Sequence, residues 1–504
     1  MNHHSPCYSV GRTIWFVALF VCGMANPSSG AEPARHLFLD PAFIQEAKEA
    51  SLHVNPARQR EIVIRPDKPW EQLMISFYLT VRDEGGKIRM WYLCRDAANR
   101  PNVAYAESSD GVNWVKPNLG IVEYQGSKEN NLVGLSIFGG VIFRDPKAQP
   151  GEEFVYVGSD DRDGVIRFTS PDGLHWRRDA QPLLPFRADT QNVTFWDERL
   201  KCYVLYLRGW DVGEVWNARL RKVVRLTLND LSKPADIKTS GRGVNPTRAS
   251  DMPRIDDEIP TVMAADERDP RDTDVYNISA QPYPLDTRWY VGFPSFFQRE
   301  RGISDGRLEV QFAGSRDGIV WNRYDRKAYA PPGLAESESA NMVFMSVGMV
   351  VRGDEIWQYA TGFNSRHGDV QARKRHTDGV IYRYVQRVDG FVSMDFANAE
   401  AKCVTKPVKV DGAQLLLNVD TGAMGKMRVA LLDSKGSALP GFAAEDCDVI
   451  RINSTRQRVS WKGASDLSGL NGTDVQVVFE GSRAKLYSFR FESQPAEATP
   501  PVAR

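Results

Sequence analysis

Short apolar runs separated by turn residues cover most of the chain between roughly residue 60 and residue 395. Typical runs are KIRMWYLCR, KCYVLYLR and DEIWQYATGF, each followed within a few residues by Gly, Asp or Asn. Runs of this length that are rich in aromatic and β-branched residues predict β-strands. Helical periodicity is visible in PAFIQEAKEASLHV near the N-terminus, so one helix is predicted there and helix content is otherwise low.

A seven-residue pattern, Ser-x-Asp-Gly-x-x-Trp, occurs three times along the chain. The copies SSDGVNW, SPDGLHW and SRDGIVW begin at Ser108, Ser170 and Ser315. Asp-Gly predicts a tight turn, because Gly adopts a positive φ without steric cost and Asp can bond its own backbone. Each Trp follows its Gly by three residues, where it can cover the turn, so we predict a structural role for all three copies.

Two further aspartates continue this series of turns through the gaps. The predicted turn aspartates are Asp110, Asp172, Asp230, Asp317 and Asp389. Their spacing of about 58 to 87 residues, in a chain of short strands, is typical of propeller blades of about four strands each. We therefore predict an all-β protein in which a five-bladed β-propeller is followed by a small β-sandwich.

The sandwich is predicted from a change in the sequence pattern after Glu400. There GAQLLLNVD, CDVIRIN and TDVQVVFEG are short alternating strands separated by Gly, Asn or Asp. The predicted parts of the chain are a signal peptide (1–31), the propeller with an N-terminal extension (32–398), the sandwich (403–493) and a disordered tail (494–504).

Charge and the N-terminal segment limit where the protein acts and what it binds. Lys plus Arg and Asp plus Glu both number 64, so no overall basic field attracts nucleic acid. Arg12 precedes a short apolar run, and small residues around Ala31 provide a cleavage site. We expect an exported protein, periplasmic or secreted, without stable membrane insertion after processing.

The cysteines predict neither a zinc site nor a redox centre. No CxxC pattern or Cys/His cluster is present. Cys403 and Cys447 are placed where an exported chain could pair them, whereas Cys94 and Cys202 lie in apolar strand-like runs and are interpreted as buried thiols. No cofactor or catalytic metal is expected, although the number of aspartates is compatible with a structural divalent cation such as calcium.

A propeller brings polar residues at the ends of its innermost strands to one channel mouth. The catalytic candidates are carboxylates near the ends of these innermost strands: Glu71, Asp145, Asp189 and Asp274. Residues that could bind substrate hydroxyls, carboxylates or ring faces are Trp70, Arg144, Arg208, Tyr283, Glu336 and His367.

The blade repeat, the Arg-Asp-Pro at residues 144–146 and the C-terminal strands together resemble the five-bladed propeller glycoside hydrolases that include invertases, levansucrases and arabinanases. In that superfamily an aspartate of such a motif stabilises the transition state, a role that the resemblance implies for Asp145. A first-blade Asp and a third-blade Glu complete the set there. This chain lacks the motifs that carry those two residues, and Glu71 and Asp189 occupy the comparable positions in blades 1 and 3.

These observations predict an exported glycoside hydrolase that cleaves an oligo- or polysaccharide with two carboxyl groups at the propeller mouth. A noncatalytic carbohydrate-binding propeller is the main alternative. A sialidase-like enzyme, which needs an arginine triad and a tyrosine nucleophile, and a phosphorylase with a basic phosphate pocket remain open.

Overall fold

The computed structural model describes residues 34–160, 163–186, 188–211, 220–237, 259–302, 304–369, 377–399 and 401–493. The described secondary structure is almost entirely β. Its helical elements with assigned bounds are short 3₁₀ segments, η1 (Pro41–Phe43), η2 (Pro69–Glu71) and η6 (Ser468–Leu470). In the described part of the chain, no helix has the length and apolar character needed to cross a bilayer.

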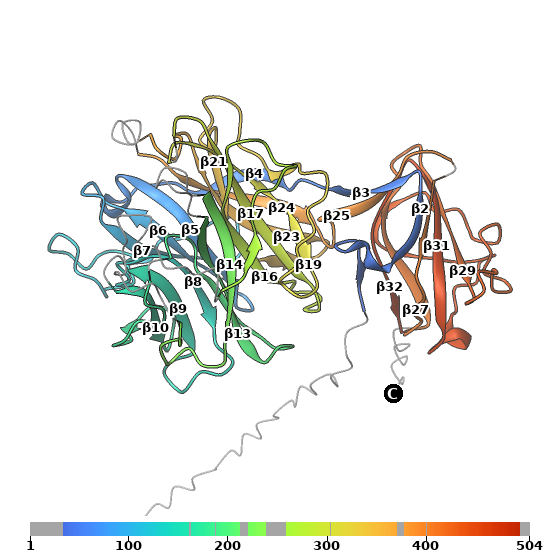
Figure 1. Cartoon of the computed structure of the whole chain (residues 1–504), viewed down its shortest axis with the longest axis horizontal. Coiled ribbons are helices and arrows are strands. Elements are labelled where there is room, and N and C mark those ends of the chain that lie inside the picture. The colour runs from blue at the N-terminus through green and yellow to red at the C-terminus, as the bar shows by residue number, and fades with distance from the viewer. Residues whose placement is uncertain are drawn as a thin grey trace, which may run out of the picture. The chain divides into compact units, whose positions relative to one another are not determined.

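Four sheets form the five blades of a propeller, and the last two blades share one sheet (Figure 1). Blade 1 contains β5 (Met74–Asp83), β6 (Ile88–Arg95) and β7 (Pro101–Ser108). Blade 2 contains β8 (Phe138–Arg144), β9 (Phe154–Asp160), β10 (Gly164–Ser170) and β11 (Arg177–Arg178). Blade 3 contains β12 (Val193–Asp197), β13 (Cys202–Asp211), β14 (Leu220–Leu228) and β15 (Thr261–Met263).

The last two blades are joined by one parallel pairing, Leu308 with Met342. Blade 4 contains β16 (Thr273–Pro282), β17 (Tyr290–Arg299), β18 (Gly306–Gln311), β19 (Ala313–Ser315) and β20 (Ala328–Ala330). Blade 5 contains β21 (Met342–Met345), β22 (Val350–Arg352), β23 (Glu355–Phe363), β24 (Val380–Arg387) and, from far upstream, β4 (Arg58–Ile64).

The first strands of the blades line the centre of the ring. β5 contacts both β8 and β21, and β12 contacts both β8 and β16. Parallel bridges join Gly140 to Asn192 and Thr80 to Val347, so these first strands run in the same direction. We call the end where they begin the entrance end and the end where they finish the exit end.

The ring is closed by the N-terminal strand β4. It pairs with β24, with Ile64 opposite Ile381, and so supplies the outer strand of the fifth blade. Closure by a strand from the other end of the propeller satisfies the edge of β24, which would otherwise be open.

The repeated turns follow the third strand of their blades and therefore lie at the exit end. In each complete copy the Ser hydroxyl accepts a hydrogen bond from the Gly N–H (2.8–2.9 Å). The Asp carboxylate accepts two further backbone N–H groups. The glycines Gly111, Gly173 and Gly318 have φ between 71° and 78°, as the Asp-Gly pattern predicts.

Each of these turns also attaches its blade to the preceding one. The Gly carbonyl accepts a hydrogen bond from an aromatic side chain on the middle strand of that neighbour. The pairs are Tyr359 to Gly111, Trp91 to Gly173 and Tyr206 to Gly318, at 2.7–2.8 Å. The repeat therefore serves the contacts between blades, in agreement with the structural role predicted for it.

Two antiparallel sheets make up the rest of the described chain. One contains β1 (His36–Leu37), β3 (Ala50–Val54), β25 (Val392–Phe396), β28 (Gln414–Asp420), β30 (Asn453–Arg458) and β32 (Ala484–Glu492). The other contains β2 (Ile44–Lys48), β26 (Ala401–Thr405), β27 (Val408–Lys409), β29 (Lys426–Leu432) and β31 (Asp474–Ser482). Both sheets contribute side chains to one hydrophobic cluster.

Two predictions about this region are corrected. The stretch predicted as a helix forms η1, β2 and β3, because β2 pairs with β26 and β3 pairs with β25. The boundary predicted at 398 is also displaced, since β1 to β3 and β25 belong to the C-terminal sheets. Tertiary strand pairing overrides the local periodicity here.

The four cysteines of the described chain are all buried free thiols. This agrees with the interpretation of Cys94 and Cys202. It excludes a Cys403–Cys447 disulfide in this structure, where the Cys447 thiol instead accepts a hydrogen bond from the Val429 N–H (3.2 Å).

Candidate functional site

Three of the central strands are interrupted by bulges near the entrance end. The ladder register shifts between Ile75 and Leu79 in β5 and between Val275 and Asn277 in β16. In β8 it shifts between Phe138 and Val141. A bulge turns a side chain out of its regular alternation and is frequent beside functional sites. Here the bulges surround one end of the channel.

The bulge in β5 places Tyr78 at φ 77°, a conformation that a bulky aromatic residue adopts only under strain. Burial raises the pKa of the Tyr78 hydroxyl well above its ordinary value, Tyr276 and Asp189 raise it further, and Arg208 lowers it. These three side chains therefore lie close enough to Tyr78 to act on it electrostatically. They come from blades 3 and 4, whereas Tyr78 comes from blade 1.

The bulge in β16 brings Tyr276 to His367, which lies in the segment after β23. The Tyr276 hydroxyl and His367 Nε2 are 2.8 Å apart, and His367 Nδ1 is 2.8 Å from the Ser304 carbonyl oxygen. A carbonyl only accepts, so Nδ1 carries the proton. In the neutral ring Nε2 then accepts the hydrogen bond of the Tyr276 hydroxyl. Phe77 packs beside this pair, with its ring centre 6.2 Å from that of His367.

Arg208 is a buried cation next to the same tyrosine. Its Nη2 donates to the Tyr276 carbonyl oxygen (2.6 Å), which the bulge frees from the ladder. Its guanidinium lies 4.6 Å from the Tyr276 ring centre and 4.9 Å from that of Trp210. Only 1% of Arg208 is exposed, and within the described residues its Nε and Nη1 have no hydrogen-bond partner. Since a buried charge is costly without compensation, this end of the channel favours negative charge.

Asp189 and Asp274 also lie at the entrance end, but they differ in how deeply they are buried. Asp189 is half-buried in the loop before β12. Asp274 begins β16, is completely buried, and is held by Arg221 (2.8 Å) and Arg299 (3.4 Å). Asp189 is therefore the more accessible of the two carboxylates.

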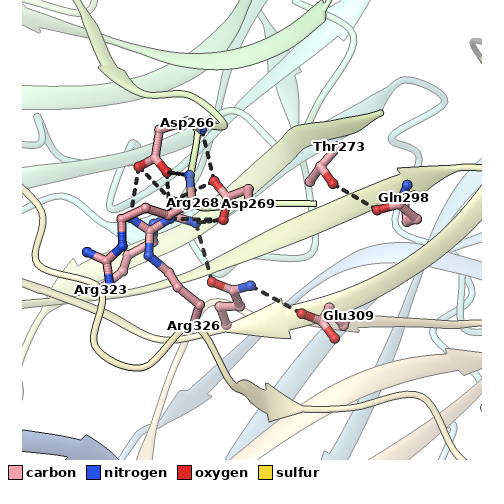
Figure 2. A network of polar contacts seen from close by, with 9 residues as sticks. Asp266, Arg268, Asp269, Thr273, Gln298, Glu309, Arg323 and Arg326 are labelled. Carbon is pink, nitrogen blue, oxygen red and sulfur yellow. Dashed lines mark hydrogen bonds and ion pairs between the residues drawn. The ribbon is translucent and has the colours of Figure 1, made fainter. Parts of the chain in front are cut away.

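The charged segment before Asp274 anchors the start of β16 (Figure 2). Asp269 is buried and pairs with Arg323 (2.7 Å) and Arg326 (2.9 Å), and Arg326 also binds Asp266 (2.8 Å). Burial raises the pKa of Asp269, while the backbone N–H of Asp266 and the Arg326 guanidinium lower it. The charges of this segment are thus used in folding.

Glu71 and Trp70 do not join the entrance-end cluster. The Glu71 carboxylate is fully buried and accepts hydrogen bonds from the Tyr92 hydroxyl (2.6 Å) and Lys116 Nζ (2.8 Å). Trp70 is buried and donates to the Asn131 side chain (2.8 Å). Both residues support blade 1, so the structure gives Glu71 no contact with Asp189 or Asp274.

Asp145 and Arg144 lie at the opposite end of the channel from Asp189. They follow β8, whose last residues are at the exit end, and Asp145 accepts a hydrogen bond from the Tyr203 hydroxyl (2.8 Å). The expectation that all four carboxylates meet at one mouth is therefore corrected. They are divided between the two ends because a strand about seven residues long separates its own first and last side chains by some 20 Å.

Tyr283 and Glu336 also fall outside the cluster. Tyr283 follows the exit end of β16, is completely buried, and donates to Asp389 (2.7 Å). Glu336 is exposed in the loop before β21, with φ 71°. Of the ten predicted site residues, the structure brings together Asp189, Asp274, Arg208 and His367.

Tyr78, Tyr276 and Phe77 belong to the cluster but are not among the ten predicted site residues. Each lies within a predicted strand, where an aromatic residue is normally interpreted as part of the hydrophobic core. The bulges that redirect them leave no pattern in β5 or β16, although the Gly139–Gly140 pair marks the bulge in β8. No group of three or more potential metal ligands occurs among the residues that the structure describes.

No family model and no curated protein matches the sequence. Among solved structures, the chain is similar to one titled "Glycoside hydrolase" (11% identity, 66% of this chain and 91% of that one, TM-score 0.43). It is also similar to an N-acetylgalactosamine deacetylase from F. plautii (14%, 68% and 96%, TM-score 0.43). A third is an arabinoxylan arabinofuranohydrolase from Bacillus subtilis (11%, 84% and 96%, TM-score 0.38). These likenesses are remote, so the chemistry of the site rests on this chain's own residues.

Proposed function

We propose that the protein hydrolyses glycosidic bonds of an oligo- or polysaccharide at the entrance end of its propeller. The observation that carries this proposal is the hydrogen bond from Tyr276 to His367 beside the half-buried Asp189 and the buried Arg208, whose Nε and Nη1 have no hydrogen-bond partner within the described residues. Glycosidic cleavage needs one group that protonates the leaving oxygen and another that attacks or activates water. The cluster supplies proton carriers of both kinds.

Each residue then has a defined role. Asp189 donates a proton to the leaving oxygen. As the bond between the anomeric carbon and that oxygen breaks, the anomeric carbon is attacked by the Tyr276 hydroxyl oxygen, or by a water molecule in its place. His367 Nε2 takes the proton of the attacking group, and Nδ1 remains bonded to Ser304. If Tyr276 attacks, water then hydrolyses the bond between Tyr276 and the sugar. Negative charge that develops on this side is stabilised by the buried Arg208, whose orientation is fixed by its bond to the Tyr276 carbonyl. Phe77 offers a half-exposed ring against which a sugar face can pack.

The test is product analysis by chromatography after incubation with a panel of plant and algal glycans. The native protein should release products, and Asp189→Asn should reduce turnover by about 10²- to 10⁴-fold while still binding the glycan. Asp230→Asn, which alters an exposed carboxylate at the exit end, is the matched control and should keep full activity. Full activity of Asp189→Asn would rule out its role as the acid.

A noncatalytic carbohydrate-binding protein is the second candidate. The observation that favours it is that Glu71 and Asp274 are both held by cations. Glycan binding by the native protein without release of any product from the panel would select this candidate.

We further propose that the protein is exported and that residues 1–31, which lie outside the described residues, are removed as a signal peptide. N-terminal sequencing of the protein recovered from the periplasm or medium tests this. A start near Glu32 is the expected result, and recovery of the intact chain from the cytoplasm would contradict it.

A further inference from the structure

A cavity occupies the exit end of the ring and has no part in the chemistry proposed above. Its volume is about 270 Å³, which is enough for a molecule of the size of one sugar residue. All five blades contribute to its wall. The side chains used below are Thr80, Arg82, Asp83, Thr194 and Gln281.

Arg82 and Asp83 are the charged residues in the wall of this cavity. Burial lowers the pKa of Arg82, Glu84 opposes that shift, and the nearby cations Arg144 and Arg89 lower the pKa further. Arg144 lies over the Phe154 ring (5.8 Å) rather than against a carboxylate of the described residues. Arg82 therefore lies near two other cations, neither of which lines the cavity.

The two carboxylates that follow Arg82 in the chain each accept a hydrogen bond from another arginine. Asp83 accepts a hydrogen bond from Arg352 Nη1 (2.6 Å), and Glu84 accepts one from Arg89 Nη1 (3.1 Å). Arg82 approaches Glu84 only at 3.5 Å, and its Nε makes no hydrogen bond within the described chain. The guanidinium of Arg82 therefore retains a donor for a ligand.

The Thr194 hydroxyl is independent evidence that a ligand binds in the exit-end cavity. It is 1% exposed, its hydroxyl has no hydrogen-bond partner in the part of the chain that the structure describes, and it lines the cavity. Buried hydroxyl groups without partners are rare, because losing water without a replacement is costly. A ligand oxygen in the cavity would satisfy the Thr194 hydroxyl, and the Gln281 side chain lies in the same wall.

We propose that the exit-end cavity binds an oxyanion group, held by Arg82 and Thr194, on a molecule no larger than one sugar residue. A free phosphate or sulfate and the carboxylate of a uronic acid share this chemistry. The site is separate from Tyr276, His367 and Asp189, so it stands whether or not the proposed hydrolytic function is correct.

The test is isothermal titration calorimetry at low salt with inorganic phosphate, inorganic sulfate, D-galacturonate and neutral D-galactose. The native protein should bind at least one of the three anions with a Kd below about 10 mM and should not bind galactose. Phosphate or sulfate binding identifies a free oxyanion as the ligand, and binding of galacturonate alone identifies an anionic sugar.

Two variants keep the test independent of folding. Thr194→Val has nearly the same shape and removes an unpaired hydroxyl, so the unliganded variant should melt at or above the temperature of the native protein while anion affinity falls at least about fivefold. Arg82→Gln should weaken binding at least about tenfold. Arg177→Gln, a change to an exposed arginine on the edge of blade 2, should bind within about twofold of the native protein. Absence of anion binding to the native protein, equal binding of galactose, or unchanged affinity in both cavity variants would overturn the proposal.

Discussion

The two ends of the propeller are built from the same strands but differ in how regular those strands are. At the exit end, three copies of one turn hold neighbouring blades together through the same hydrogen bond from an aromatic side chain. At the entrance end, bulges break the ladders of β5, β8 and β16 and direct Tyr78 and Tyr276 to a buried arginine and a histidine. Regular geometry thus joins the blades, and the departures from it collect the reactive groups.

The largest expected effect is at the entrance end. Tyr276→Phe keeps the ring between Arg208 and Phe297 but removes the hydroxyl that His367 binds. Hydrolysis should fall by about 10²- to 10⁴-fold in kcat with little change in Tm. Tyr203→Phe at the exit end, which removes the hydrogen bond to Asp145, is the control and should retain kcat. If Tyr203→Phe lost activity and Tyr276→Phe did not, the assignment of chemistry to the two ends would be reversed.

The second prediction compares the loss of stability when a Cβ is added to a glycine with positive φ at each end of the propeller. A Cβ on Gly139 in the entrance-end bulge would lie 1.9 Å from the Thr190 carbonyl oxygen, whereas one on Gly85 in an exit-end hairpin meets nothing within 4 Å. Gly139→Ala should therefore lose about 3 kcal/mol or more of unfolding free energy, and Gly85→Ala about 1 kcal/mol. Denaturant titration followed by tryptophan fluorescence measures both, and equal losses would show that the bulge is not tightly packed.

The smallest effect concerns the charge of an exit-end turn. Burial acts to raise the pKa of Asp172, but hydrogen bonds from the backbone and side chain of His175 and from the backbone of Leu174 bring it down to about 2. Because this pKa is below its unfolded value, the charged carboxylate contributes stability above about pH 4, and the contribution is lost as pH falls toward 2.

Asp172→Asn keeps an oxygen that can accept the same backbone hydrogen bonds. It should lower Tm by about 1–2 °C at pH 7, and the difference should disappear near pH 2. Thermal melts followed by circular dichroism at several pH values measure this. A difference that is constant across this range would show that the charge makes no contribution.

The strands and turns of the blades were predictable because each repeats a local rule. Asp110, Asp172 and Asp317 cap the backbone of their own turns, so the cause of the structure lies within a few residues. The apolar runs of β6, β13 and β23 are likewise local, and all three occur as strands.

The closure of the ring, the fold of the N-terminal segment and part of the candidate site depend on partners that are distant in sequence. Nothing around Ile64 indicates that it pairs with Ile381, and β2 reads as helical because β26 is far away. The site was predicted where a polar residue stands near a strand end, as with Asp189 and His367. Tyr78 and Tyr276 were not among the predicted residues, because their orientation depends on a ladder shift. Asp145 was expected at the same end as Asp189 but lies at the other end, since it follows β8 and Asp189 precedes β12.

The pairing of β4 with β24 has a consequence for how the protein can be divided into expression fragments. A fragment that starts after residue 64 leaves blade 5 with an open edge on β24, and one that stops at residue 398 leaves β2 without β26. Because the last blade is completed by a strand that precedes the first blade, the ring can close only after all five blades have been synthesised. Domain-by-domain production of this protein is therefore expected to give aggregation, and biochemical work is best done on the intact chain.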